Sequence, residues 1–283
     1  MSSRVLLSGA TGFLGQQILR TLQADGIDVR LIQRSNEKQS ALPNNNSIFR
    51  TEDLFSESSQ WLEQACEGID TIIHSAWYVE AGKYLRSDRN MDCLIGTLNF
   101  AKAAVQAGVK RFVGIGTCLE YQSSNAQITT DNPLDPQTPY AAAKAATYLM
   151  LSQFLAEHNV EFAWCRVFYL YGENENPKRL FPYVRAQLEA GKPVELTSGN
   201  QIRDYLDVKI AGRMIAEIAK DQKQGAFNIC SGKPTTVRQL VEELADGYNA
   251  RHLLRFGAKP ENPDEEMVIF GQQTNFSESQ PNN

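Results

Sequence analysis

Short apolar runs alternate with stretches of helical periodicity along residues 4–171 of the chain. The first run, Arg4–Ser8, is followed after a glycine by Phe13–Ala24, in which apolar residues recur at helical spacing. A short apolar run predicts a buried strand, and helical spacing predicts an amphipathic helix. The chain is therefore expected to begin with a strand, a turn and a helix.

The same order continues as far as residue 168. Further strands are predicted, in chain order, at Asp28–Gln33, Ile48–Thr51, Ile69–His74, Arg111–Gly116 and Glu161–Phe168. Further helices are predicted at Ser56–Cys66, Leu94–Ala107 and Tyr140–Glu157. Strands separated by helices pair in parallel through crossover connections, so this order predicts an α/β fold with a doubly wound parallel sheet of the Rossmann type.

The pattern loosens after Tyr171. Helices are predicted at Arg179–Ala190, Asp207–Lys220 and Thr236–Asn249, and extended segments at Pro193–Leu196 and Phe227–Cys230. Because these elements alternate with turns, we expect a smaller substrate-binding lobe and no second regular sheet. The predicted domains are a dinucleotide-binding domain, residues 1–171 with a contribution from 207–230, and a lobe formed mainly by 172–283. The polar tail 272–283 is expected to fray.

Composition and charge exclude several classes of protein. The 283 residues include 28 Lys and Arg against 33 Asp and Glu, which gives a formal net charge of −5. Non-specific nucleic-acid binding needs clustered cations, so no nucleic-acid partner is expected. No apolar run approaches the roughly 20 residues of a membrane helix, and the first residues do not resemble a cleavable signal. We therefore expect a cytoplasmic protein without a membrane partner.

Cysteine and histidine are too sparse to indicate a metal or disulfide framework. The five cysteines form no CxxC motif, and the three histidines show no HExxH spacing. We expect reduced thiols in the core and no metal site.

A glycine-rich turn follows the first predicted strand. Glycines at this place allow a tight turn, let backbone N–H groups approach a pyrophosphate and permit close packing of helix on strand. Although GxxGxxG alone is also found in ordinary turns, its place between a strand and a helix favours a dinucleotide site. The expected cofactor contacts in this turn are Gly9, Thr11, Gly12, Phe13, Leu14 and Gly15.

The end of the second predicted strand indicates which dinucleotide binds. An NAD site would place Asp or Glu there to bind the ribose 2′-hydroxyl, but the chain has Gln33 and Arg34. The planar guanidinium of Arg34 suits a 2′-phosphate, which favours NADP, with NAD as the alternative. The other interpretation of Arg34 is a solvated arginine in a loop.

Tyr140 and Lys144 form a YxxxK pair, and Thr117 lies just after the strand Arg111–Gly116. Residues four apart share a helix face, so Lys144 is expected to lie beneath Tyr140 and to lower the pKa of its phenol. Thr117 can hydrogen-bond the same substrate oxygen. YxxxK alone occurs on ordinary helices, but its combination with the glycine turn predicts an acid–base site.

Seven further segments complete a pattern that resembles a known family. They are Asp53–Leu54, His74–Ala76, Gly96–Leu98, Gly116–Tyr121, Pro139–Lys144, Arg166–Gly172 and Arg203–Tyr205. In this order, with the glycine turn, they resemble the extended short-chain dehydrogenases/reductases of the NAD-dependent epimerase/dehydratase family, which act on nucleotide sugars. The resemblance extends from residue 4 to about residue 270.

The resemblance implies a role for individual residues. Asp53 and Leu54 match the adenine contacts, Ala76 lines the cofactor, and Phe168 and Tyr169 match the segment that passes the nicotinamide. The implied catalytic residues are Thr117, Tyr140 and Lys144. Tyr140 and Lys144 are also expected to contact the cofactor. The expected substrate contacts are Thr117, Glu120, Tyr169, Arg179 and Arg203, the last binding the sugar-nucleotide phosphates. The other interpretation of Arg203 is an ion pair with Asp204 or Asp207.

The chain also departs from the family pattern. Cys93 stands where the family usually has Asn, and Asn90 lies one turn earlier. A substrate-binding Arg-Pro-Gly-Asp segment is replaced by Asn262–Glu265, which weakens the expectation of a second phosphate-binding arginine. Relatives usually continue into another helix, so part of the nucleotide pocket wall is expected either to be absent or to be supplied by a partner subunit.

Three functions compete at this point. The first is reduction of a keto group, at C4, of a nucleoside-diphosphate 4-keto-6-deoxysugar; the second is a 4-epimerase with tightly bound NAD; the third is a non-catalytic dinucleotide sensor. Arg34 favours the reductase, and the Tyr140 and Lys144 pair disfavours the sensor. Cys118 follows Thr117 where dehydratases have an acid, although Glu120 lies nearby. The resemblance also implies a homodimer, through helices 94–107 and 140–157.

Overall fold

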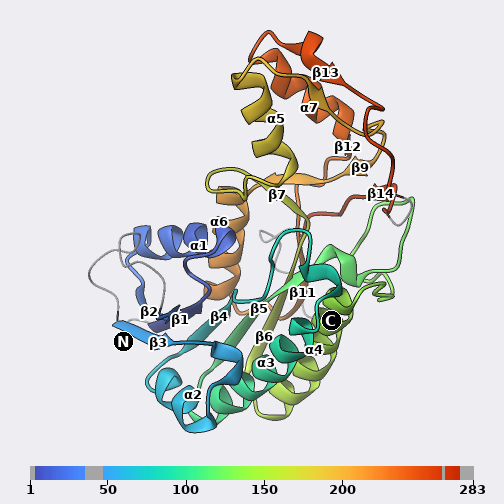
Figure 1. The fold of residues 1–283 in the computed structure, drawn as a ribbon. Coiled ribbons are helices and arrows are strands. Elements are labelled where there is room, and N and C mark those ends of the chain that lie inside the picture. Colours follow the sequence, from blue (N-terminus) through green and yellow to red (C-terminus); the bar gives the residue numbers. More distant parts are fainter. Residues whose placement is uncertain (1–3, 36–46, 263–264, 275–283) are drawn as a thin grey trace.

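A seven-stranded parallel sheet forms the centre of the computed structural model, which describes residues 4–35, 47–262 and 265–274 (Figure 1). The strand order is β11-β6-β5-β4-β1-β2-β3, and all neighbouring strands are parallel. The strands are β1 (Arg4–Ser8), β2 (Asp28–Arg34), β3 (Ser47–Thr51), β4 (Thr71–His74), β5 (Arg111–Thr117), β6 (Glu161–Val167) and β11 (Gly225–Ile229). The predicted doubly wound Rossmann-type fold is confirmed.

Helices cover both faces of this sheet (Figure 1). One face carries α1 (Phe13–Ala24) and α6 (Val208–Lys220); the other carries α2 (Ser59–Cys66), α3 (Arg89–Gln106) and α4 (Pro139–Glu157). Successive strand residues point to opposite faces, so Leu6 packs among the second group and Leu7 among the first. Both leucines are fully buried, which explains why β1 is a continuous apolar run.

A smaller lobe lies beyond the carboxyl ends of the strands (Figure 1). Its helices are α5 (Leu180–Glu189) and α7 (Val237–Asp246), which pack with the short strand β8 (Val194–Glu195) around a separate apolar core. Its short strands pair as β7 (Tyr169–Tyr171) with β10 (Tyr205–Asp207), β9 (Ile202–Arg203) with β12 (Thr235–Thr236) and β14 (Val268–Ile269), and β8 (Val194–Glu195) with β13 (Leu254–Arg255). The described part of the lobe therefore contains small sheets of two or three strands, as the sequence predicts.

The chain returns from the lobe to the sheet through α6 and β11. β11 pairs with β6, and Gly212 of α6 lies so close to α1 that a Cβ there would come within 2.6 Å of the Gln17 Cβ. Residues 208–229 therefore belong to the layers of the central sheet.

Some boundaries differ from the sequence prediction. Helix α3 begins at Arg89, five residues before the predicted start at Leu94, because its first turn is polar and gives no apolar spacing. Helix α2 begins at Ser59 and is preceded by a separate 3-10 turn, Leu54–Ser56, in place of one helix from Ser56. Most of the predicted fraying tail, residues 275–283, lies outside the described residues.

The structure also describes the cysteines, the helices and the candidate metal ligands that the sequence analysis considered. All five cysteines are buried free thiols, as predicted. Within the described ranges, none of the helices combines the length and apolar character needed to cross a membrane. The same residues hold no cluster of three or more His, Cys, Asp or Glu side chains suited to a metal.

Candidate active site

A cavity of about 770 Å³ lies at the carboxyl ends of the sheet strands, between the sheet and the lobe. This is the edge at which open parallel sheets bind ligands. The residues expected to contact the cofactor all line this cavity: Gly9, Thr11, Gly12, Phe13, Leu14, Gly15, Arg34, Asp53, Leu54, Ala76, Tyr140, Lys144 and Phe168. Three of the five expected substrate contacts line it too: Thr117, Tyr169 and Arg179.

The glycine turn has the geometry of a dinucleotide cradle. Gly9 has a φ of +74°, and a Cβ there would lie 2.7 Å from the Ala76 backbone nitrogen. A Cβ at Gly15 would lie 2.0 Å from the Gly9 carbonyl oxygen, so only glycine lets α1 pack this closely on the turn. Helix α1 begins after Gly12 without a side-chain cap, which leaves its first N–H groups available to an anion.

His74 supports this turn from behind. It is buried, and its ring nitrogens form hydrogen bonds with the hydroxyls of Ser8 (2.8 Å) and Thr97 (2.9 Å). The Ser8 hydroxyl in turn accepts a hydrogen bond from the Ala76 backbone at 3.3 Å. Burial lowers the pKa of His74 to about 3, with a smaller effect from the charge of Lys144. The ring is therefore neutral and has a structural role.

Two arginines and two acids line the end of the cavity near strands β2 and β3. Arg34 ends β2, and Glu52 follows β3 directly. Arg89 donates to Asp53 at 2.6 Å, and the Asp53 side chain also accepts from the backbone of Phe55. Positive and negative charges are therefore mixed at this end of the cavity. Asp53 also caps the 3-10 turn Leu54–Ser56.

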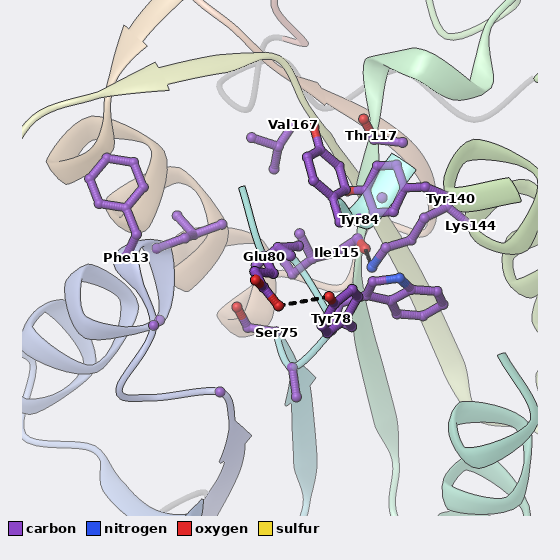
Figure 2. A pocket seen from close by; sticks show the side chains of 18 of the residues that line it. Phe13, Ser75, Tyr78, Glu80, Tyr84, Ile115, Thr117, Tyr140, Lys144 and Val167 are labelled. Carbon is purple, nitrogen blue, oxygen red and sulfur yellow. Dashed lines mark hydrogen bonds between the residues drawn. The ribbon is translucent and has the colours of Figure 1, made fainter. Parts of the chain in front are cut away.

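Tyr140 is buried beneath an aromatic neighbour. Its ring lies edge-on to the ring of Tyr84, with centroids 4.8 Å apart (Figure 2). Burial is the main reason that the pKa of the Tyr140 phenol is raised, and nearby Tyr84 and Glu120 add to this, whereas a hydrogen bond with Thr117 acts in the opposite direction. Tyr140 is therefore protonated at neutral pH.

The Lys144 ammonium contacts a backbone carbonyl and an aromatic ring. Its Nζ donates to the Ile115 carbonyl at 2.6 Å (Figure 2) and lies 3.7 Å from the centroid of the Trp77 ring. The expectation that the phenol pKa is brought down toward neutrality is wrong for this structure, because burial dominates at Tyr140 and raises that pKa. Burial also lowers the pKa of Lys144 itself, to about 7.

Glu120 is not a substrate contact. It is fully buried, it is not among the residues that line the cavity, and its carboxylate accepts hydrogen bonds from Arg166 (2.8 Å) and the Thr117 backbone (2.7 Å). The Trp164 indole donates to the same carboxylate. Thr117 and Glu120 form a capping box, a pattern that Thr-Cys-Leu-Glu already carries in the sequence. Glu120 therefore holds the turn that presents Thr117.

Arg203 also lies away from the cavity wall. Its side chain is only 2% exposed, it packs on the ring of Tyr169, and it donates to Glu265 at 2.7 Å. The alternative partners expected from the sequence were also wrong, because Asp204 accepts from the loop at Ser231 and Asp207 caps α6. The acid in the replaced Asn262–Glu265 segment thus occupies this guanidinium; residues 263–264 lie outside the described residues.

A second cavity of about 270 Å³ adjoins the first on the lobe side. Tyr84, Tyr169 and Arg179 line both cavities. Lys178 and two further aromatic side chains, Phe181 and Tyr205, line the second cavity as well, together with one acid, Glu175. The rings and cations of this wall suit a ligand with both planar and anionic parts.

Sequence reasoning missed the residues between β4 and α3. Trp77 and Tyr84 contact Lys144 and Tyr140, and Arg89 lines the cavity beside Asp53. The local signal was the pair of aromatics directly after the His74–Ala76 segment. A predicted loop at the carboxyl edge of a parallel sheet is a place where site residues gather, so this signal could have been used.

Known proteins share the motifs and the arrangement described above. The family model "NAD dependent epimerase/dehydratase family" matches residues 5–230. The chain is 24% identical to a dTDP-6-deoxy-L-talose 4-dehydrogenase (NAD(+)) of Aggregatibacter actinomycetemcomitans, over 94% of this chain and 98% of that protein. It is 26% identical to a dTDP-glucose 4,6-dehydratase of Streptomyces griseus, over 88% of this chain and 80% of the other.

Solved structures show the same fold. A UDP-glucose 4-epimerase of Thermotoga maritima with UDP-glucose superposes with a TM-score of 0.85 at 21% identity, over 96% of this chain and 90% of that one. A UDP-glucose 4-epimerase of Thermus thermophilus in complex with NAD gives a TM-score of 0.81 at 24% identity, over 95% and 90%. The chain belongs to the NAD-dependent epimerase/dehydratase family of extended short-chain dehydrogenase/reductase enzymes.

Proposed function

We propose that this protein is an NAD(P)-dependent oxidoreductase that reduces the C4 keto group of a nucleoside-diphosphate 4-keto-6-deoxysugar. The observation that carries the proposal is the position of Tyr140: a protonated phenol, hydrogen-bonded with Thr117, in the wall of the cavity that also contains the glycine turn, and beside Tyr84, which lines both cavities. The 4-dehydrogenase relative is named for the reverse type of reaction, and this chain covers 98% of its length.

The residues of the cavity supply acid–base chemistry and orientation. The bound dinucleotide would supply the hydride. Thr117 and Tyr140 hydrogen-bond the carbonyl oxygen, and the Tyr140 hydroxyl donates its proton to that oxygen as negative charge develops on it. The raised pKa of Tyr140 suits this direction of reaction, because a general acid must carry its proton when the substrate arrives. The Lys144 ammonium stabilises the phenolate that remains.

The second cavity is proposed to bind the nucleoside diphosphate. Arg179 and Lys178 would contact its phosphates, and the rings of Tyr169 and Phe181 would contact its planar base. We retain, as part of this proposal, the division into a dinucleotide domain, 1–171 with a contribution from 207–230, and a substrate lobe formed mainly by 172–283. Arg203 and Glu120 are left out of the substrate contacts because both are buried in ion pairs.

For the cofactor we propose NADP, on the basis of Arg34. Its guanidinium lines the cavity at the end of β2, and Arg89 adds a second cation nearby. NAD is the alternative, and two observations support it. Glu52 lines the same end and would repel a 2′-phosphate, and two of the four relatives described above are named with NAD.

A 4-epimerase is the second candidate function, supported by the fold shared with two UDP-glucose 4-epimerases. An epimerase oxidises and then reduces the same carbon, so its tyrosine must accept a proton as readily as it donates one. A buried, protonated Tyr140 favours the reductive step. Dehydration is disfavoured because Cys118 and Leu119 line the cavity after Thr117, whereas the nearby acid, Glu120, is buried.

We also propose a homodimer formed through α3 and α4. Four large apolar side chains are more than half exposed on these two helices: Met91, Ile95, Leu149 and Met150. A second copy of the same surface would cover them in a symmetric contact. The buried free thiols support the proposal of a reducing, cytoplasmic location.

The test is a turnover assay with both dinucleotides. Purified protein is incubated with NADPH or NADH and with dTDP- or UDP-linked 4-keto-6-deoxyglucose, while nicotinamide oxidation and sugar reduction are measured together. The proposal predicts one dinucleotide oxidised per sugar reduced. Conversion of a UDP-hexose into its C4 epimer without net dinucleotide oxidation would favour the epimerase instead.

A further inference from the structure

The segment between β4 and α3 places an aromatic face against the ammonium of Lys144. The Lys144 Nζ lies 3.7 Å from the centroid of the Trp77 ring, and the Lys144 residue is only 3% exposed. A cation within about 6 Å of an aromatic centroid is attracted by the negative face of the ring, most strongly for tryptophan. Trp77 also lines the cavity, so its indole forms part of the same wall.

The Trp77 indole is fixed on its other side by a buried amide. Its N–H donates to the Asn90 side-chain oxygen at 2.9 Å. The Asn90 amide nitrogen donates to the backbone carbonyls of Tyr84 (2.6 Å) and Ser87 (2.9 Å). Asn90 is 1% exposed, and these three partners of its side chain lie in the segment that carries Trp77. The amide therefore holds the shape of this segment and the orientation of the indole.

The same segment also contacts Tyr140, the proposed proton donor. Tyr84, whose backbone carbonyl accepts from Asn90, places its ring edge-on to Tyr140 with centroids 4.8 Å apart (Figure 2). Asn90 thus links one aromatic residue that contacts Lys144 with another that contacts Tyr140. A change in this segment would affect both members of the YxxxK pair.

Lys144 depends on these contacts because its surroundings offer little else for its charge. In the described part of the chain, the hydrogen bond at Nζ is to the Ile115 carbonyl, and the side chain forms no ion pair. A second aromatic ring, that of Trp164, is more distant, with its centroid 5.9 Å from Nζ. The titratable groups that act on it are Glu120, which is paired with Arg166, and the buried thiol of Cys93. His74, on β4, is neutral.

We propose that Trp77, oriented by Asn90, is a positioning residue that holds the Lys144 ammonium in place and favours its charged form. The proposal rests on the proposed function only in taking Lys144 as a group of the reaction. The competing explanation is that Trp77 simply fills space beside Phe55, whose ring lies 6.2 Å away. A space-filling role predicts no effect on the charge of Lys144.

The direct test is a titration of the Lys144 side chain by NMR in protein labelled at lysine, with the signal assigned by its loss in Lys144→Met. In the parent protein the ammonium should lose its proton as the pH rises through about 7. In Trp77→Leu this midpoint should fall by about one pH unit, which corresponds to a tenfold change in the proton equilibrium. Trp77→Phe, which keeps a weaker aromatic face, should lie between them.

The pH dependence of kcat provides a second readout. The ammonium is the working form, so kcat should decline as the pH rises through the Lys144 midpoint, and Trp77→Leu should move this decline to lower pH. Asn90→Leu should shift it in the same direction by a smaller amount, because the indole is kept but loses its hydrogen bond. Trp61→Leu is the matched control, because Trp61 packs on Phe49 and is not part of the cavity wall.

The outcomes separate this proposal from the proposed function. A folded Trp77→Leu protein whose Lys144 midpoint equals that of the parent would overturn the role of Trp77, whatever the activity. If Trp77→Leu does not fold, the same comparison is made with Trp77→Phe and Asn90→Leu, and unchanged midpoints in both overturn it. Absence of turnover with every keto sugar would contradict the proposed function but would leave the titration readable.

Discussion

The two walls of the large cavity are built in different ways. On the sheet side, each residue expected to contact the dinucleotide lines the cavity, and the turn is determined by backbone geometry at Gly9 and Gly15. On the lobe side, Arg203 is buried against Glu265, and at the junction Glu120 is buried against Arg166. A local motif therefore locates the cofactor wall, whereas the substrate wall depends on which charged side chains find partners elsewhere in the chain.

The difference has a physical origin. A glycine motif acts through steric limits that neighbouring residues impose, so its meaning is local. A buried charge must be paired or hydrogen-bonded, and its partner can come from any part of the fold. Arg166 and Arg203, whose side chains are both 2% exposed, engage Glu120 and Glu265. Glu120 and Arg203 are therefore structural residues, although the sequence suggests them as site residues.

The largest expected effect is at the junction of the two walls. Tyr140→Phe removes the proposed proton donor but leaves the glycine turn intact, so kcat should fall by about 10²- to 10⁴-fold while dinucleotide affinity is retained. Tyr148→Phe is the matched control on the same helix, because Tyr148 packs on Phe162 outside the cavity wall. Steady-state kinetics and a dinucleotide binding titration check both. Near-parental turnover of Tyr140→Phe would show that the proton comes from another group.

A second prediction concerns the buried acid. Glu120→Gln leaves the Arg166 guanidinium buried without a countercharge, so the free energy of unfolding should fall by about 3 to 5 kcal/mol. Glu161→Gln, which breaks the ion pair with Arg111, should cost only about 1 kcal/mol because Glu161 is 37% exposed. Denaturant unfolding of both variants tests this contrast. If the two losses are equal, the buried pair is not the stronger structural element.

The cofactor wall is tested at Arg34. A bidentate contact to a 2′-phosphate contributes about 1.5 to 3 kcal/mol, so NADPH should bind the parent more tightly than NADH and Arg34→Ala should narrow the difference. Arg50→Ala, on the neighbouring strand β3, is the control, because Arg50 is exposed and does not line the cavity. Fluorescence titrations measure the affinities. Equal affinities in the parent would contradict the NADP assignment and favour NAD.

The substrate wall is tested by comparing two arginines. Arg179 is exposed and lines both cavities, so Arg179→Ala should raise KM for a nucleotide sugar by about tenfold, equivalent to about 1.4 kcal/mol. Arg203→Ala should instead lower stability and leave KM close to the parental value, because Arg203 is buried behind Tyr169. A raised KM for Arg203→Ala in a fully folded protein would mean that substrate displaces Glu265 from this arginine.

The smallest effect is the pH dependence that comes from His74. Its pKa is lowered to about 3 in the folded protein, so between this value and its ordinary pKa the unfolded chain binds more protons. Stability is therefore complete above an ordinary pKa of about 6.5 and is lost as the pH falls, by about 1 kcal/mol for a decrease of one pH unit. His74→Asn should show a shallower dependence in urea unfolding at mildly acidic pH. An unchanged slope would mean that other groups dominate.

The difference between local motifs and distant partners also explains how much of the fold and of the site the sequence predicts. Alternating apolar runs and helical periods predicted β1 and α1 with the observed bounds, because burial on both faces of the sheet dictates that pattern. The start of α3 was missed because Asn90, in its polar first turn, is buried through hydrogen bonds that periodicity does not encode. The partner of Arg203 lies 62 positions away, in a segment without a recognisable pattern.

One measurement tests the central claim of C4 reduction most directly. The protein is supplied with NADPH or NADH in which both hydrogens at the nicotinamide C4 position are replaced by deuterium, and with the nucleoside-diphosphate 4-keto-6-deoxysugar. The product is analysed by NMR and mass spectrometry. We predict one deuterium at C4 of the sugar per dinucleotide oxidised, and loss of this transfer in Tyr140→Phe. A sugar product without deuterium at C4, or formed without stoichiometric oxidation of the dinucleotide, would contradict C4 reduction.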